Sequence, residues 1–335
     1  MRATSYSSTL ILPPATLAAF SHTPNRMNVF NTILPIIAVA ALGYAARYWR
    51  VLNEIEAAAI ERVALWFLIP VLLFLGAATA AFPAEFDWRY LGVFYGVTLG
   101  MYLLAMMAGR LCFGFGWREL SVFGMTSAYG NVTVLGIPLI LQFLGEGAFV
   151  PMIVVITFHN LLLFGFGTLV AGRGEAGDGG VWRKCGRVLR EMLFNPISGS
   201  LLAGACWNLT GLGLYEPLRA TLALLSQAAV PGALFALGAA LTRYRIRGGI
   251  ATALLLTLLK LAVLPLLMWL AMAPFDFPLL WQQTAVLLSA MPVGINVYVF
   301  SRRYQCLETA AATSIVLTSL LAGISSGAWT WWLLH

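Results

Sequence analysis

The chain alternates long apolar stretches with short polar connections over nearly its whole length. Each stretch holds about 20 residues, the length that an α-helix needs to cross a hydrocarbon core roughly 30 Å thick. The pattern therefore predicts an all-α integral membrane protein with about ten transmembrane helices. The expected helices cover residues 28–48, 57–77, 88–112, 119–144, 147–171, 195–213, 217–242, 249–273, 279–301 and 308–333.

The second half of the chain repeats motifs of the first half at a nearly constant separation. Pro70 recurs as Pro231 (231 − 70 = 161), and Ser127 recurs as Ser289 (289 − 127 = 162). Five helices per half is an odd number, so the second half must enter the membrane in the opposite orientation. The sequence thus predicts 5+5 inverted repeats, an arrangement typical of secondary transporters that bind substrate where the repeats meet.

The repeats divide the chain into four segments. The N-terminal extension matches nothing downstream, and Pro13-Pro14 interrupts its apolar run. We interpret it either as a signal peptide or as the product of a start codon placed too early. The segments are the extension 1–26, the first five-helix repeat 27–172, a linker rich in glycine and charge 173–194, and the second repeat 195–335.

Composition and charge support a membrane location and give its orientation. Hydrophobic residues make up 60% of the chain and charged residues 10%, far below the roughly 25% of soluble domains. The net charge is +7. The cations gather on alternate connections, near 47–62, 110–118, 173–190, 243–247 and 302–303. This positive-inside bias predicts a multi-pass cytoplasmic (inner) membrane protein with both termini outside and a cytoplasmic linker, and it argues against nucleic acid as a partner.

The fourth and ninth predicted helices are interrupted at corresponding positions. The residues concerned are Gly130, Asn131 and Pro138 in the fourth helix, and Pro292, Gly294 and Asn296 in the ninth. Proline and glycine favour unwinding, and backbone groups freed in hydrocarbon must face protein, water or a ligand. Two half-helix N-termini directed into one cavity would form a site for an anion such as a carboxylate. The alternative is that these residues merely kink packed helices and that the asparagines bond between helices.

Two ionisable residues, Lys260 and His159, lie near the middle of predicted helices. Lys260 is close to the middle of its helix, where a charge is costly and commonly functional. It either faces the cavity, compensating the substrate's charge or titrating during transport, or it bonds backbone carbonyls at the end of a broken helix. His159 could relay a proton for coupling, or it could serve as a neutral hydrogen-bonding group between helices.

Several kinds of chemistry are missing from the sequence. Every acidic residue falls in a connection or near a helix end, with Glu61 closest to the interior. This argues against a sodium/proton antiporter, which needs carboxylates at the crossing point of its broken helices. The histidines are His22, His159 and His335, and the chain has no glycine-rich phosphate loop and no Cys/His cluster. We therefore expect no enzyme activity, no cofactor and no metal site.

Several motifs occur in a fixed order across residues 28–334: VFNTILPIIAVAALGY, IPVLLF, YGNVTVLGIPL, FNPISGSLLAG, AAVPGALFALGAAL and AMPVGINVYVFSRRY. In these motifs the chain resembles the auxin efflux carrier family, which includes bacterial malate and malonate permeases and plant PIN-type auxin carriers. The linker is short, unlike the long regulated loop of many plant members.

The resemblance implies an inverted-repeat fold of ten helices with an elevator-like division into scaffold and transport domains. It implies small organic anions as substrates, held where the fourth and ninth helices cross, with Asn131, Pro138, Pro292 and Asn296 at that crossing. Homodimers are common in this fold group, and the coupling ion could be H⁺ or Na⁺ or absent. A sodium-coupled bile-acid-type symporter or antiporter of the same fold stays an alternative, as does a membrane receptor that binds a ligand without transporting it.

Overall fold

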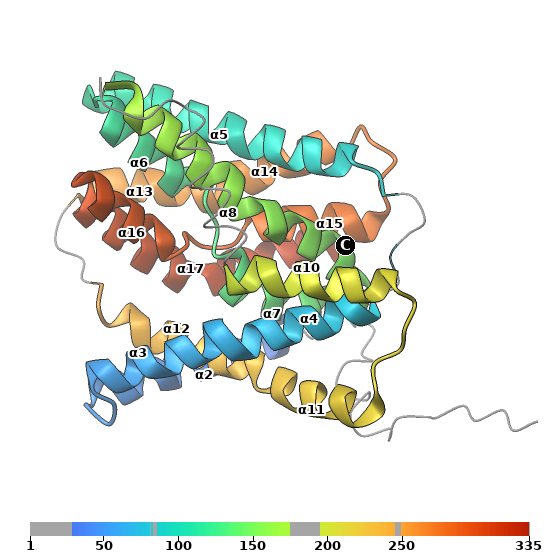
Figure 1. The fold of residues 1–335 in the computed structure, drawn as a ribbon. Helices are drawn as coiled ribbons and strands as arrows, with labels where there is room; N and C mark the ends of the chain where they lie inside the picture. The colour runs from blue at the N-terminus through green and yellow to red at the C-terminus, as the bar shows by residue number, and fades with distance from the viewer. Residues whose placement is uncertain (1–28, 81, 83–85, 175–194, 245–248, 335) are drawn as a thin grey trace, which may run out of the picture.

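The computed structural model describes residues 29–80, 82, 86–174, 195–244 and 249–334, which are largely helical (Figure 1). The extension 1–26 and most of the predicted linker lie outside the described residues. The helices are α2 (Val29–Tyr48), α3 (Glu54–Val63), α4 (Ile69–Thr79), α5 (Arg89–Phe113), α6 (Trp117–Ala128), α7 (Ile137–Leu144), α8 (Phe149–Ala171), α10 (Pro196–Leu209), α11 (Glu216–Gln227), α12 (Ala229–Leu241), α13 (Ile250–Leu258), α14 (Leu264–Met272), α15 (Leu279–Ser289), α16 (Asn296–Tyr304) and α17 (Glu308–Leu334).

Within these residues, six helical stretches are long and apolar enough to cross a membrane, so the prediction of an all-α multi-pass membrane protein is confirmed. The six are Glu54–Thr79, Arg89–Phe113, Glu146–Ala171, Glu216–Leu241, Ile250–Met272 and Glu308–Leu333. The other predicted helices are shorter or interrupted, and the count of ten stays a prediction. The sixth predicted helix is shorter than expected because α10 ends at Leu209, just before Gly211 adopts a φ of +68°.

Three π-helical turns widen the helices, and each ends two residues before a proline. They are η1 (Ala64–Leu68), η2 (Val132–Gly136) and η5 (Leu259–Val263), followed by Pro70, Pro138 and Pro265. Proline has no N–H for the carbonyl four residues earlier, and its ring crowds that carbonyl. For Pro265 the carbonyl is that of Leu261, which instead accepts bonds from Ser325 Oγ and Trp329 Nε1 of α17, both at 3.1 Å. The proline thus frees an acceptor that fastens a neighbouring helix.

The helices form two groups that differ in their packing partners. In one group α12 packs along α2 and α3, and α4 packs along α10 and α11. In the other group α6 packs on α5 and α8, α14 on α5 and α15, and α17 on α13 and α16. Figure 1 shows α2, α3, α4, α11 and α12 on one side of the molecule, with α5, α6, α13 and α14 on the other. The two broken helices bring their gaps to the region between the groups.

Two close backbone contacts in the first group are related by the sequence repeat. A Cβ on Gly43 of α2 would collide with the carbonyl oxygen of Phe235 in α12, and a Cβ on Gly204 of α10 would lie 2.5 Å from the carbonyl oxygen of Phe74 in α4. Gly204 follows Gly43 by 161 residues (204 − 43), and Phe235 follows Phe74 by 161 (235 − 74). Small residues that let backbones approach are a common means of packing helices in membranes. The repeated sequence therefore makes the same helix contact twice.

Candidate substrate site at the helix crossing

The two interrupted helices meet where each one unwinds. The fourth predicted helix breaks between α6 and η2, and the ninth between α15 and α16. The freed segments form an antiparallel bridge between Gly130 and Val293. Asn131 N donates to Pro292 O at 2.7 Å, and Gly294 N donates to Tyr129 O at 3.2 Å. The two segments thus satisfy part of each other's backbone hydrogen-bonding capacity, as a segment far from water requires.

Glycine is needed at position 294 because of this close approach. A Cβ there would collide with the ring of Tyr129 and lie 3.3 Å from the carbonyl oxygen of Gly130. The backbone of Gly294 is not in the left-handed region. Its role is therefore to leave space for the crossing segment rather than to permit an unusual turn.

Each segment also has one amide held by a neighbouring long helix. Gly130 N donates to His159 Nε2 of α8 at 3.2 Å, and Val293 N donates to Thr318 Oγ1 of α17 at 3.1 Å. His159 is buried, and its Nε2 must be unprotonated to accept this bond, which places the proton on Nδ1. Among the described residues Nδ1 has no hydrogen-bond partner. His159 is therefore a neutral acceptor in this conformation.

Lys260 lies behind the crossing, at the ends of the first half-helices. Its Nζ donates to Ser289 O at 2.9 Å and to Ala128 O at 3.4 Å, and the residue is 1% exposed. Ser289 is the last residue of α15 and Ala128 the last residue of α6. A helix C-terminus carries partial negative charge and carbonyls without intrahelical partners. The placement favours the second interpretation of Lys260, a cation that bonds the ends of the broken helices.

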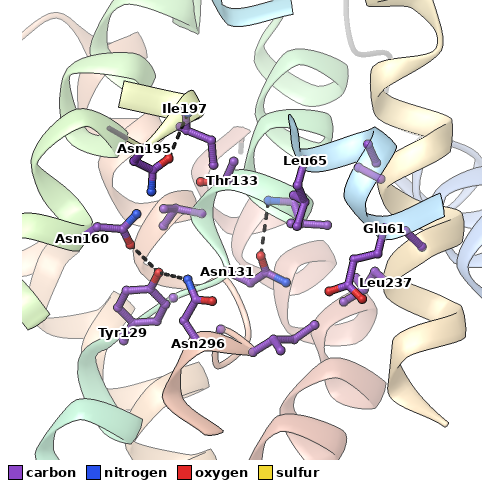
Figure 2. Close-up of a pocket in the computed structure, with 18 residues that line it drawn as sticks. Glu61, Leu65, Tyr129, Asn131, Thr133, Asn160, Asn195, Ile197, Leu237 and Asn296 are labelled. Carbon is purple, nitrogen blue, oxygen red and sulfur yellow. Dashed lines mark hydrogen bonds between the residues drawn. The ribbon is translucent and has the colours of Figure 1, made fainter. Parts of the chain in front are cut away.

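A pocket opens on the other side of the crossing, where the second half-helices begin (Figure 2). Its volume is about 120 Å³. Residues 131–134, at the start of η2, and residues 294–296, at the start of α16, line it together with residues of α3, η1, α8 and α12. The positive ends of two helices therefore face one small cavity, while Lys260 occupies the negative ends of their preceding halves.

Uncharged polar groups gather on one side of this pocket. Tyr129 OH donates to Asn160 Oδ1 and accepts a bond from Asn296 Nδ2 at 2.9 Å (Figure 2). Asn131 Oδ1 caps η2 by accepting from Val134 N at 3.3 Å. Asn195 Oδ1 accepts from Ile197 N at 2.9 Å. In each of Asn131, Asn160 and Asn195 the oxygen is engaged, which leaves the NH₂ group as a donor available to a ligand.

The structure brings together part of the predicted site. Gly130, Asn131, Gly294 and Asn296 line the pocket. Pro292 lies at the crossing but contributes its carbonyl to Asn131, and Pro138 lies in the first turn of α7; neither is among the lining residues. Lys260 and His159 contact the crossing from outside the pocket. The binding roles of these residues stay predictions.

Sequence analysis missed several lining side chains: Glu61, Tyr129, Thr133, Asn160 and Asn195. Tyr129 and Thr133 belong to the YGNVT motif, and Asn160 follows His159, so adjacency to predicted residues was a usable signal. Asn195 precedes Pro196 at the start of α10, a position that is typical of a helix cap alone. Only the tertiary fold brings its free amide to the pocket.

A family model described as "Membrane transport protein" matches residues 28–330, nearly the whole chain. The chain belongs to this family. It is the auxin efflux carrier family that the motifs indicated. A "Putative malonate transporter" of Rhizobium meliloti (strain 1021) is 33% identical to the chain over 209 residues. The match covers 61% of this chain and 64% of the relative, so the chain spans slightly under two thirds of that relative's length. An "Uncharacterized transporter" of Methanothermobacter thermautotrophicus is 26% identical over 72% of this chain and 77% of its own. The chain is thus a multi-pass membrane protein of this membrane transport family.

Proposed function

We propose that this auxin efflux carrier family member is a secondary transporter of small organic carboxylate anions. The observation that carries the proposal is the pocket at the helix crossing, where two half-helices begin and three asparagine NH₂ groups are available as donors. Helix N-termini and neutral amides bind carboxylates without requiring a buried cation. Asn131, on one broken helix, would hold the carboxylate with its NH₂ group, and Asn296, on the other, would use the second N–H of Nδ2, because the first is donated to Tyr129 OH.

The pocket and a relative together indicate the substrate's size. A volume of about 120 Å³ lies below the roughly 300–1,000 Å³ of sites for drug-sized ligands. It suits an acid of a few carbon atoms better than a steroid such as a bile acid. The relative from Rhizobium meliloti bears the name of a malonate transporter, which supports malonate or the similar malate as the substrate.

The mechanism we propose is alternating access by 5+5 inverted repeats in the cytoplasmic membrane. The paired contacts of Gly43 with Phe235 and of Gly204 with Phe74 support a two-fold relation between the halves. The group containing α2, α4, α10 and α12 would be the scaffold, and the group with the crossing would carry the substrate. If both termini lie outside and the 173–194 linker lies in the cytoplasm, as we propose, Glu61 and Arg243 would lie toward the cytoplasm, and the pocket that Glu61 lines would open near that side. A homodimer, the assembly common in this fold group, is part of the proposal.

Proton coupling has a concrete route in this arrangement. A proton bound to His159 Nε2 would replace the lone pair that accepts from Gly130 N, so the crossing would lose one of its anchoring bonds. We rank sodium coupling lower, because the acidic residues of the chain lie in connections or near helix ends. A sodium-coupled symporter or antiporter and a receptor that does not transport are the competing proposals, and facilitated diffusion needs no coupling ion.

The test is counterflow in proteoliposomes with labelled malonate and malate, with sodium and pH gradients imposed separately. Wild type should show saturable uptake, and Asn131→Ala should reduce it at least tenfold while the protein stays folded. The control is Asn53→Ala, which changes an exposed asparagine outside the pocket whose side chain accepts from Glu56 N at the start of α3. Folded wild type that takes up no carboxylate would refute the proposal, and binding without counterflow would favour the receptor.

A further inference from the structure

The pocket has a charged end that the carboxylate site described above does not use. Glu61 of α3 lines the pocket, and it is the one acidic residue among the 18 lining residues. Figure 2 shows it across the pocket from Tyr129, Asn160 and Asn296, with Asn131 between them. A carboxylate in the wall of an anion site is unfavourable by simple electrostatics, because like charges in a partly desolvated cavity repel. Its presence therefore needs a compensating cation.

Arg243, just after α12, supplies that cation. Its Nη1 lies 2.9 Å from Glu61 Oε2, and the two side chains are 31% and 25% exposed. Arginine carries five N–H donors in a planar fork, and this bond engages a single nitrogen. The bond to Glu61 uses Nη1 and leaves Nε and Nη2 available to a second carboxylate that reaches Glu61, the lining residue beside which Arg243 lies.

We infer that Arg243 binds the second carboxylate of a dicarboxylic acid at this end of the pocket, and that Glu61 holds the guanidinium in place and limits the affinity for the dianion. The inference rests on the proposed function. One carboxylate of the substrate meets the amides of the crossing, and the other meets the free donors of Arg243. The pair thus makes the site select dicarboxylates over monocarboxylates of the same length.

Substituting Arg243 and substituting Glu61 should change the KM for malonate in opposite directions. Arg243→Gln removes a charge-assisted hydrogen bond to the second carboxylate, which should raise the KM for malonate about tenfold. Glu61→Gln keeps an amide oxygen that can accept from Arg243 but removes a negative charge from the pocket, so it should lower the KM for malonate. Arg243→Lys keeps the charge and should lie between wild type and Arg243→Gln.

The experiment compares malonate with propionate, which has three carbons but one carboxylate. The KM for labelled malonate and the inhibition constant of propionate against malonate uptake are measured for each variant in proteoliposomes. The matched control is Arg219→Gln, which breaks the exposed Arg219–Glu216 pair of 2.7 Å at the start of α11. Size-exclusion profiles show whether each variant is folded.

A tenfold rise in the malonate KM for Arg243→Gln, a fall for Glu61→Gln and a clearly smaller change in the propionate constant in both would support the inference, because propionate carries one charge and makes no bond to Arg243. Changes of equal size for both acids, or unchanged constants for both, would overturn it and leave the pair as a structural bond between α3 and the end of α12. Wild type that transports no carboxylate would instead refute the proposed function, and this outcome is visible before any variant is compared. If Arg243→Gln fails to fold, Arg243→Lys and Glu61→Gln still test the inference, because they should raise and lower the malonate KM respectively.

Discussion

Lys260 should stabilise the crossing rather than bind the substrate, and Lys260→Met tests this. Methionine has a similar length and no charge, so it fills the same space while leaving the carbonyls of Ser289 and Ala128 without their donor. The 2.9 Å bond to Ser289 is the stronger of the two, and a hydrogen bond to a charged group contributes about 1.5–3 kcal/mol. The 3.4 Å bond to Ala128 and the interaction with two helix C-termini add to it.

An opposing contribution reduces the expected loss. A buried ammonium costs several kcal/mol of desolvation, and methionine removes that cost. The two carbonyls nevertheless stay buried at the helix ends, each at about 1–3 kcal/mol if it finds no other partner. We therefore expect a net destabilisation of about 2–3 kcal/mol, which for a chain of 335 residues corresponds to a fall in Tm of about 3–4 °C.

The assay is thermal unfolding in detergent, followed by tryptophan fluorescence, together with malonate uptake in proteoliposomes. Thr257→Val is the control, because Thr257 is buried one turn earlier and bonds only Ala253 O of its own helix. Lys260→Met should lower the Tm well below that of the control and lower the maximal rate of uptake. An unchanged Tm combined with a large rise in the malonate KM would refute the reasoning and assign Lys260 to the substrate.

Two further predictions concern packing and thiol chemistry. Gly43→Ala and Gly204→Ala should each lower the Tm of the detergent-solubilised protein, because the added methyl group would press on a carbonyl of the facing helix, whereas Gly92→Ala, which meets open space, should not; equal Tm values in all three variants would contradict the repeated contact. Burial raises the pKa of the Cys306 thiol to about 11. Since the thiolate is the reactive form, a variant retaining only Cys306 should react with maleimide about 100-fold more slowly at pH 8 than a thiol of ordinary pKa. The rate should increase as the pH rises. A reaction rate that does not change between pH 8 and pH 10 would contradict this pKa.

Much of the architecture could be predicted because a helix that crosses a membrane appears in the sequence as an apolar stretch of defined length. Bilayer thickness sets their length, and the hydrophobic stretches at 88–112 and 249–273 differ by at most a residue from Arg89–Phe113 and Ile250–Met272. The interruption of the ninth helix was also visible, since proline and glycine at 292 and 294 mark an unwound segment. Local sequence chemistry determines these features, so no tertiary information was needed.

The contacts across the crossing could not be predicted in the same way. Sequence placed Lys260 in mid-membrane but left two roles open, and only the packing of α6, α15 and η5 brings its ammonium to two helix ends. The position of Glu61 in the pocket could not be predicted either. From the sequence alone, Glu61 lies in the first turns of a helix near a membrane surface. It lines the pocket because α3 packs against α12 and because η1 follows directly, features set by long-range packing.

The charges at the ends of the broken helices suit the proposed binding of one carboxylate at the crossing. Each helix N-terminus carries roughly half a positive charge, so the two that face the pocket together offset about one negative charge. The C-termini of α6 and α15 would weaken this potential from behind, and Lys260 neutralises them by bonding one carbonyl of each. A second carboxylate exceeds what the two helix ends can offset. It therefore requires a cation outside the crossing, and we propose that Arg243, which bonds the lining residue Glu61, supplies it.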